Sequence, residues 1–363
     1  MTSAQATTDC RFCSQVSKAN GEDPIGSAPV TDHWLITEMP LPWSAQIMKQ
    51  PQIQPVLSLI KTLALAGVKV RPIAIAPDRE YSQAGYRRVL FYSRPDRFFA
   101  TYQKQEYLLP EAEVAPLAVA LLKQIANQPN DLKRFEGYRQ PNGLTRDLLV
   151  CTHGNVDAAC ARFGFPIYDK LRKHYADGSA TNEQGQLRVW RCSHFGGHQY
   201  APTLLDLPEG RYWGHLEPEM LDQLVYRSGI AADLGRFYRG CASLGKFEQI
   251  AEREIWLQEG WQWLTFAKQG RVVRLGESWF KRCLRSTLQW IPSKRLRFLL
   301  ERSKQDAVWA EVQIDYATSE GSKGSYRARV AVSGQIMTAI RSAEPIEQVP
   351  VNQYQVTALV KLG

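Results

Sequence analysis

Two short stretches decide how this chain folds and what it binds: CTHGNVDAAC (151–160) and SHFGGH (193–198). Each places two side chains that ligate metals in proteins close together in the sequence. About one helix and one strand separate the stretches, so a single sheet can bring them to the same edge. The four candidate ligands are Cys151, Cys160, His194 and His198.

Each candidate ligand falls where a predicted element starts or ends. Cys151 closes a strand, and Cys160 lies a turn or two into the next helix, where backbone N–H dipoles favour a thiolate over a thiol. His194 closes the following strand. The glycine pair after Phe195 lets the chain double back, so that His198 can face the same point. Four ligands can therefore converge on one site.

The residue types narrow the chemistry of such a site. A tetrahedral Cys₂His₂ zinc site is allowed. The metalloprotease signature H-E-x-x-H is excluded, because Phe195 follows His194 and offers no general base. A Rieske centre is excluded because the spacing from Cys192 to His194 is one residue too short. The C-x-x-C motif CRFC (10–13) precedes the first strand in a polar tail, and it leaves a thiol oxidoreductase or an accessory metal pair as alternatives.

The composition is that of an ordinary globular protein. The chain has 363 residues, of which 44% are hydrophobic and 22% charged, which suits two or three domains with real cores. The N-terminus lacks a basic start followed by an apolar run, and no stretch approaches the roughly 18 apolar residues of a membrane span. Seven cysteines, an odd number, without an export signal favour reduced thiols over a disulfide framework. We therefore expect a cytoplasmic protein with no membrane span.

The net charge of +9 is concentrated in one segment, 271–304, which holds ten Lys or Arg and two acids. Within it, SWFKRCLRSTLQWI (278–291) places apolar side chains at helical spacing with basic ones beside them. The favoured interpretation is a solvated helix that packs its apolar side on the core. The alternative is a docking surface, first for an acidic redox protein, since complementary charge speeds encounter. A basic binding module for nucleic acid or anionic lipid is a further alternative, with nucleic acid the less expected partner.

Two segments of the chain follow the same predicted order of elements, β-α-β-β-β-α. This order fits the thioredoxin topology, a mixed sheet with helices on both faces. In the first segment, strands are expected at 33–40, 68–76, 87–93 and 99–109, and helices at 44–66 and 111–127. In the second, strands are expected at 147–153 and 187–194, a hairpin at 202–216, and helices at 156–175 and 217–229. The remainder is predicted to be helical to about 268 and to end in strands at 308–317, 325–334 and 353–362.

The predicted fold class is therefore α/β (α+β), with two thioredoxin-like domains in tandem plus a C-terminal helical and β-meander extension. In the first domain, Glu38 and Met39 stand where the second domain offers Cys151. The predicted boundaries are 1–29 for a tail with the C-x-x-C motif, 30–128 for the domain without ligands, 141–245 for the domain with the four ligands, and 246–363 for the extension.

The segment CTHGNVDAACARFG (151–164), followed by VWRCSHFGGHQYAPTLLDLPEG (189–210), closely resembles the sucrase/ferredoxin-like family, the thioredoxin-like ferredoxins. The shared features are the C-x₈-C segment that opens with CTHG and the later SHxGGH loop. The resemblance is specific over roughly 147–216. It is suggestive at the N-terminus and weak after about 245.

The resemblance implies an electron-transfer protein with a 2Fe-2S cluster and no catalytic activity of its own. A structural zinc protein with the same ligands stays open as an alternative. The word sucrase finds no support, because no pair of carboxylates can be defended as a glycosidase acid and nucleophile. The implied cluster ligands are Cys151, Cys160, His194 and His198. The implied bystanders or supporting residues are His153, Cys192 and Cys241.

Overall fold

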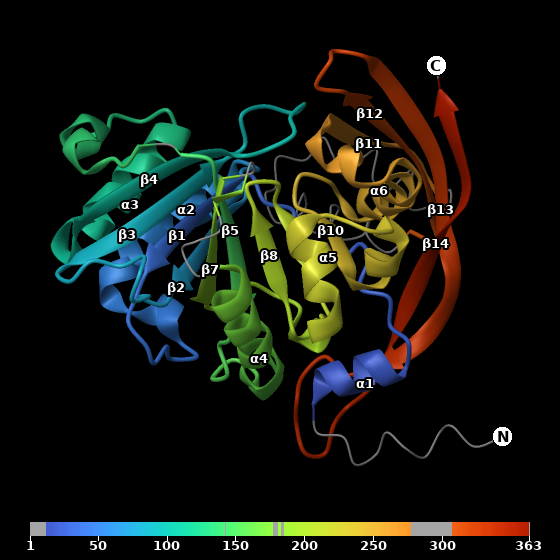
Figure 1. Ribbon diagram of the computed structural model, residues 1–363, viewed down its shortest axis with the longest axis horizontal. Coiled ribbons are helices and arrows are strands. Elements are labelled where there is room, and N and C mark those ends of the chain that lie inside the picture. Colours follow the sequence, from blue (N-terminus) through green and yellow to red (C-terminus); the bar gives the residue numbers. More distant parts are fainter. Residues whose placement is uncertain (1–11, 142, 177–180, 183–184, 277–306, 363) are drawn as a thin grey trace.

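The computed structural model describes residues 12–141, 143–176, 181–182, 185–276 and 307–362, which form two sheets with helices around them (Figure 1). One is a large mixed sheet with the strand order β10-β9-β8-β5-β7-β2-β1-β3-β4, and the other is an antiparallel sheet of four strands. The predicted α+β class is confirmed.

The first half of the molecule is a four-stranded unit covered by two helices. Its strands are β1 (His33–Glu38), β2 (Val70–Ile75), β3 (Tyr86–Ser93) and β4 (Gln103–Pro110). β1 runs parallel to β2, with α2 (Gln54–Leu65) between them in the chain, and antiparallel to β3, which pairs with β4. α2 and α3 (Glu111–Ile125) bury apolar side chains such as Leu63 and Leu121 against Leu35 and Phe91 of the strands.

The second half repeats this pairing. Its strands are β5 (Thr145–Cys151), β7 (Gly185–Cys192), β8 (Leu204–Leu207) and β9 (Arg211–Trp213), and a short β6 (Thr181–Asn182) pairs with β7. β5 runs parallel to β7 and antiparallel to β8, which pairs with β9. α4 (Ala158–Tyr175) connects β5 to the β6–β7 hairpin, and Pro166 lies inside it without ending it. α5 (Leu221–Tyr226) follows β9.

The register of the two parallel pairs is also equivalent. The last residue of β1 faces the last residue of β2, Glu38 opposite Ile75, and the last residue of β5 faces that of β7, Cys151 opposite Cys192. Glu38 therefore occupies the position of Cys151, as the sequence comparison of the halves predicted. Its buried carboxylate accepts hydrogen bonds from the Arg88 N–H, at 2.9 Å, and from the Ser82 hydroxyl. A structural carboxylate thus stands where the second half has a thiol.

The two halves share an interior as well as a sheet. β2 and β7 are antiparallel neighbours at Ile75 and Cys192 only, so the strands diverge beyond this point. One cluster of buried side chains draws from both halves, which means that their strands face each other across a common core. Its members include Trp34, Ile73, Leu90 and Tyr92 of the first half and Leu149, Trp190, Leu205 and Tyr212 of the second. The boundaries 30–128 and 141–245 stay predictions: the two halves share this cluster, although the first half also has a core of its own under α2 and α3.

A buried ionic network reinforces this contact between the halves. Asp147 of β5 is fully buried and accepts hydrogen bonds from Arg188 and Trp190 of β7, at 2.9 and 2.8 Å, and from Lys104 of β4, at 2.9 Å. Arg188 also donates both Nη groups to Glu106 of β4 at 2.9 Å. Burial alone would raise the pKa of Glu106, but Arg188 and Lys104 lower it to about 2.

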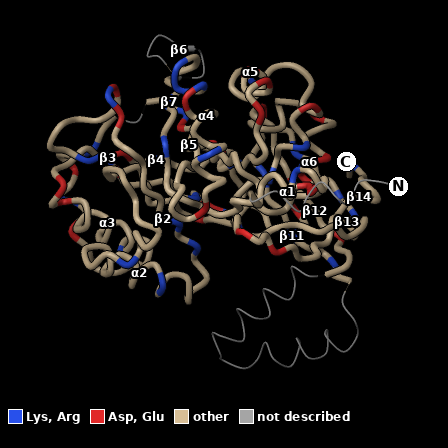
Figure 2. Tube along the Cα trace, turned by 90° about the horizontal axis from the view of Figure 1, so that it is seen from below, with Lys and Arg blue, Asp and Glu red and all other residues tan. Residues whose placement is uncertain are grey.

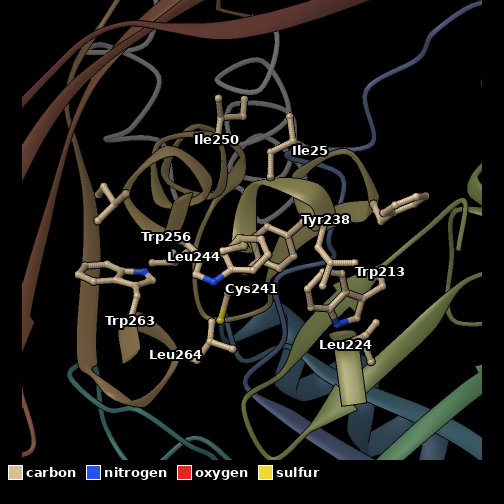
Figure 3. Packing of buried hydrophobic residues seen from close by; sticks show 14 of the residues in the cluster. Ile25, Trp213, Leu224, Tyr238, Cys241, Leu244, Ile250, Trp256, Trp263 and Leu264 are labelled. Atoms are coloured by element: carbon tan, nitrogen blue, oxygen red, sulfur yellow. The ribbon is translucent and has the colours of Figure 1, made fainter. Parts of the chain in front are cut away.

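The C-terminal part is an antiparallel meander with a helix packed on it. Its strands β11 (Ala267–Leu275), β12 (Trp309–Ala317), β13 (Lys323–Thr338) and β14 (Val349–Leu362) pair in chain order. α6 (Lys246–Glu259) presents Trp256 and Ile250 to a core that also holds Trp263, Tyr238 and Trp213 (Figure 3). The predicted meander is present, with one strand more than expected.

Two strands lie where the sequence predicted helix. β10 (Tyr238–Cys241) pairs with β9 at the edge of the large sheet, and β11 begins at Ala267. β10 has four residues, YRGC, and β11 reads AKQGRVVRL, so neither shows the regular apolar alternation that indicates a strand. Pairing with an existing sheet edge decides their conformation. The other expected elements are present, with α2 preceded by two short 3₁₀ turns, η1 (Ile47–Lys49) and η2 (Pro51–Ile53).

The basic segment can be placed only at its start, because residues 277–306 lie outside the described residues. The predicted docking helix around 278–291 therefore stays a prediction. Arg271 and Arg274 lie on β11 and pair with Asp315, at 2.6 Å, and Glu311, at 3.9 Å, of β12. Basic and acidic residues are interspersed along the described chain (Figure 2). No described helix is both long enough and apolar enough to cross a membrane.

The buried network yields a stability prediction. Arg188→Met should lower the unfolding free energy of the metal-free protein by about 3–5 kcal/mol at pH 7, because Asp147 and Glu106 would keep buried charges without their main partner. Since the folded-state pKa of Glu106 and of Asp147 is depressed, the network stabilises the fold above pH ~4 and this contribution is lost as the pH falls further. The difference between the two proteins should therefore narrow in acid. Urea unfolding at pH 7 and in acid measures this difference in unfolding free energy.

The matched control is Lys173→Met. Lys173 pairs with Asp169 at 2.9 Å on the surface of α4, with side chains 67% and 40% exposed. Its loss should cost at most about 1 kcal/mol. Equal unfolding free energies for Arg188→Met and the wild type at pH 7 would contradict a role for this network in joining the halves.

Candidate metal centre

The four candidate ligands come from two neighbouring strand ends. Cys151 is the last residue of β5, and Cys160 lies in the first turn of α4. Asp157 caps that helix, because its side chain accepts the Ala159 N–H at 2.9 Å. His194 lies two residues after β7, which runs beside β5. The helix start and the strand end thus meet at one edge of the sheet.

Three of the four ligands converge closely. Nδ1 of His194 lies 3.9 Å from Sγ of Cys151 and 3.8 Å from Sγ of Cys160. The three donor atoms all lie within 4.8 Å of one another, and both thiols are buried. The structure therefore brings together two thiols and one imidazole that are distant by sequence but were predicted to meet.

His198 lies beside this group but faces another. It begins η4 (His198–Tyr200), and its ring centroid is 5.3 Å from that of His194. Its Nδ1 lies 3.3 Å from a carboxylate oxygen of Asp157 and 3.5 Å from Sγ of Cys13. The sequence did not single out Asp157, although its position just before a helix indicates an N-cap. Cys13 was noticed only as part of CRFC, and it begins α1 (Cys13–Ala19) instead of lying in a free tail.

The two buried thiols differ in their readiness to ionise. A hydrogen bond from Cys160 and the proximity of His194 hold the pKa of Cys151 well below its usual range. The same contact with Cys151, together with burial, raises the pKa of Cys160. One thiolate therefore forms readily, but two adjacent buried thiolates need a cation between them. This donor set could hold a metal ion.

Burial favours the neutral form of the His198 imidazole. Burial lowers the pKa of His198 below its usual value, and Asp157 offsets part of that effect. A neutral imidazole is the form that binds a metal ion. Nearby, His153 is held by the Trp43 carbonyl at 3.2 Å, and Cys192 and Cys241 are buried outside both donor groups. His153 also accepts the His194 N–H at 3.4 Å, so its ring supports the histidine loop from outside the donor group.

The histidine loop is shaped by one buried cation. Gly197 has a φ of +82°, and a Cβ added there would lie 2.3 Å from an Nη atom of Arg239. Arg239 donates to the Gly196 carbonyl and to the Ser27 carbonyl, both at 3.0 Å. Glycine is required at 197 both for the left-handed backbone and for the close approach of the guanidinium.

The ligand-free half supports the same loop from the other side. Ser193 exchanges hydrogen bonds with Ala74 of β2: its N–H donates to the Ala74 carbonyl at 2.8 Å, and its Oγ accepts the Ala74 N–H at 2.9 Å. Arg71 of β2 donates to the Phe195 carbonyl at 2.9 Å. The first half thus helps to hold the histidine loop in place rather than supplying ligands to the centre.

The role of the loop can be tested with two glycines. Gly197→Ala should weaken metal binding by about 10–100-fold, because the methyl group displaces Arg239 and with it the loop that carries both histidines. Gly67→Ala is the control, since Gly67 has a similar φ of +89° but nothing within 4 Å of an added Cβ. Both variants should lose about 1–2 kcal/mol of stability through backbone strain. Cobalt titration of the metal-free proteins, followed by visible absorption, separates them, and equal cobalt affinities would contradict this role.

A family model described as sucrase/ferredoxin-like matches residues 24–240 of the chain. Comparison with curated proteins gave no match, and neither did comparison with solved structures. The matched range contains Cys151, Cys160, His194 and His198, whereas Cys13 lies outside it. Over more than half of its length, with the predicted ligands inside the match, the chain belongs to the sucrase/ferredoxin-like family.

Proposed function

We propose that this protein carries electrons on one 2Fe-2S cluster held by two thiolates and two imidazoles. The observation that supports this most is the convergence of two buried thiols and His194 at one sheet edge, with the His198 ring alongside. Cysteine and histidine are the ligands that such clusters take, and the cluster, when bound, supplies one-electron transfer. The proposed ligands are Cys151, Cys160, His194 and His198.

The chain's own residues prepare the site for this task. The shared core and the Gly196–Gly197 loop hold the donors in place, and burial of both thiols keeps water away from them. Nδ1 of His198 faces the Asp157 carboxylate, which can accept a hydrogen bond from the ring N–H. Substrate chemistry is left to a partner protein. We propose an acidic redox protein that docks on segment 271–304, attracted by its positive charge.

A structural zinc ion is the second candidate, and the observed distances are compatible with it. With Zn–S near 2.3 Å and Zn–N near 2.0–2.1 Å, a tetrahedral site separates sulfur from nitrogen by about 3.6 Å. The observed separations from His194 to the two sulfurs, 3.8 and 3.9 Å, are close to this. Iron in a cluster uses similar bond lengths, so the contents of the site must be measured.

The metal content decides between the two. Protein purified without oxygen should be red-brown, with about two irons and two labile sulfides per chain. Cys151→Ser and Cys160→Ser should abolish the colour, whereas Cys241→Ser should keep it, because Cys241 is a buried thiol bonded to the Glu209 carbonyl and not to the donor group. Iron, sulfide and zinc analysis with absorption and EPR spectra provides the measurement. A colourless wild type with one zinc, even after reconstitution with iron and sulfide, would refute the cluster.

Histidine ligation predicts the redox behaviour. The potential should lie above the roughly −400 mV of plant-type ferredoxins, because neutral imidazoles replace thiolates. It should fall as the pH rises into the alkaline range, since reduction makes the free ring nitrogen hold its proton more tightly. His194→Cys should lower the potential and weaken its pH dependence. His174→Cys, at an exposed position of α4, is the control and should change neither. A low potential that does not vary with pH would argue against histidine ligands.

A further inference from the structure

A second group of metal-ligating side chains lies beside the first. Sγ of Cys13, Nδ1 of His198 and a carboxylate oxygen of Asp157 all lie within 4.8 Å of one another. Cys13 is completely buried and Asp157 is nearly so. Neither of these two belongs to the ligand set proposed for the cluster, and Cys13 lies outside the range that the family model matches.

The spacing of these donors suits one tetrahedral ion. With the bond lengths that zinc prefers, sulfur should lie about 3.6 Å from nitrogen or oxygen, and nitrogen about 3.4 Å from oxygen. Sγ of Cys13 lies 3.5 Å from His198 Nδ1 and 3.8 Å from each carboxylate oxygen of Asp157. Nδ1 of His198 lies 3.3 Å from Oδ2 of Asp157. These separations match those between three ligands of one tetrahedral ion.

Three hydrogen bonds fix the Asp157 carboxylate in this orientation. It accepts the Ala159 N–H at 2.9 Å and, from Ser342, the N–H at 2.9 Å and the hydroxyl at 2.6 Å. Figure 1 shows α1 beside the loop that joins β13 to β14, which carries Ser342. The Cys13 N–H donates to the Ser342 hydroxyl at 3.1 Å. Such outer hydrogen bonds orient carboxylate ligands in metal sites.

We propose that Cys13, Asp157 and His198 bind a single divalent ion of the zinc type, at a site distinct from the Cys151–Cys160–His194 group. The ion binds as Cys13 releases its thiol proton, and His198 and the carboxylate supply lone pairs, so no electron is transferred. Because the site joins α1 to α4 and to the histidine loop, the ion fixes the N-terminal helix over the centre. The site belongs to the apoprotein: His198 is also a proposed cluster ligand, so the ion and the cluster compete for its imidazole, and the inference rests on the proposed function in that respect alone.

The test uses the full chain in a background that lacks the first thiol pair, Cys151→Ser with Cys160→Ser. Titrated with Co²⁺, this protein should bind one equivalent and show sulfur-to-cobalt charge transfer in the near ultraviolet. Adding Cys13→Ser should abolish the charge-transfer band. Adding Asp157→Asn should weaken cobalt binding by about 10-fold or more, while asparagine keeps the helix cap. Adding Cys241→Ser is the control and should change neither stoichiometry nor spectrum.

Wild-type apoprotein provides a second measurement should the background variant fold poorly. It should bind two equivalents of Co²⁺, and Cys13→Ser alone should reduce this to one. An unchanged stoichiometry and an unchanged charge-transfer band in Cys13→Ser would overturn the site. The outcome is independent of the cluster: cobalt binding that requires Cys13, in a protein that never assembles iron and sulfide, would support this site and refute the proposed function.

Discussion

The buried guanidinium of Arg239 is the interaction on which the centre depends. It donates to the carbonyls of Gly196 and Ser27 and lies over the rings of Tyr200 and Tyr212, at 5.3 and 5.6 Å. No ion pair of the described residues includes it, and burial lowers its pKa to about 10. Burying an unpaired charge costs several kcal/mol. Hydrogen bonds, the two rings and the negative charge of a Cys151 thiolate offset part of that cost.

This arrangement couples the histidine loop to segments far away in the chain. The Ser27 carbonyl ties the stretch before β1 to Arg239, and the Gly26 N–H donates to the Arg239 carbonyl at 3.0 Å. The stretch before β1 therefore binds β10 by backbone and side chain together. The charge of Cys151 acts on Arg239, the buried cation that, with Arg71, orders the loop. The charge of the centre and the conformation of the loop therefore depend on each other.

The ligand-free half explains how the half-buried glycine loop is held in place. In the second half, β7 would be a sheet edge at its C-terminal end, where His194 emerges. β2 covers that edge through Ile75 and Cys192, and Arg71 fixes the carbonyl of Phe195. Elements built on rigid strands position ligands better than free loops. The half without ligands therefore holds in place the loop of the half that has them.

The part of the site that local sequence could predict is the part held by local geometry. Cys151 and Cys160 are separated by one strand-to-helix turn, so spacing indicated that they meet near His194, whereas it did not indicate that His198 faces Cys13 and Asp157. The contact between Cys13 and Ser342 could not be predicted, because 329 positions separate them and neither lies in a recognisable pattern. β10 and β11 were missed for the related reason that their conformation comes from the sheet edges they join. Long-range pairing, and not local propensity, decides the Cys13–Ser342 contact and the conformation of β10 and β11.

The charge of the proposed ligands suits histidine at this depth. In the proposed cluster, two thiolates would balance the charge of an oxidised core, whereas four would leave the site anionic in a region where both sulfurs are buried. Asp157, a fixed anion beside His198, is already engaged by Ser342 and by the start of α4. Burial would oppose the negative charge that the proposed cluster gains upon reduction. The guanidinium of Arg239, on which the charge of Cys151 acts, would offset part of that cost.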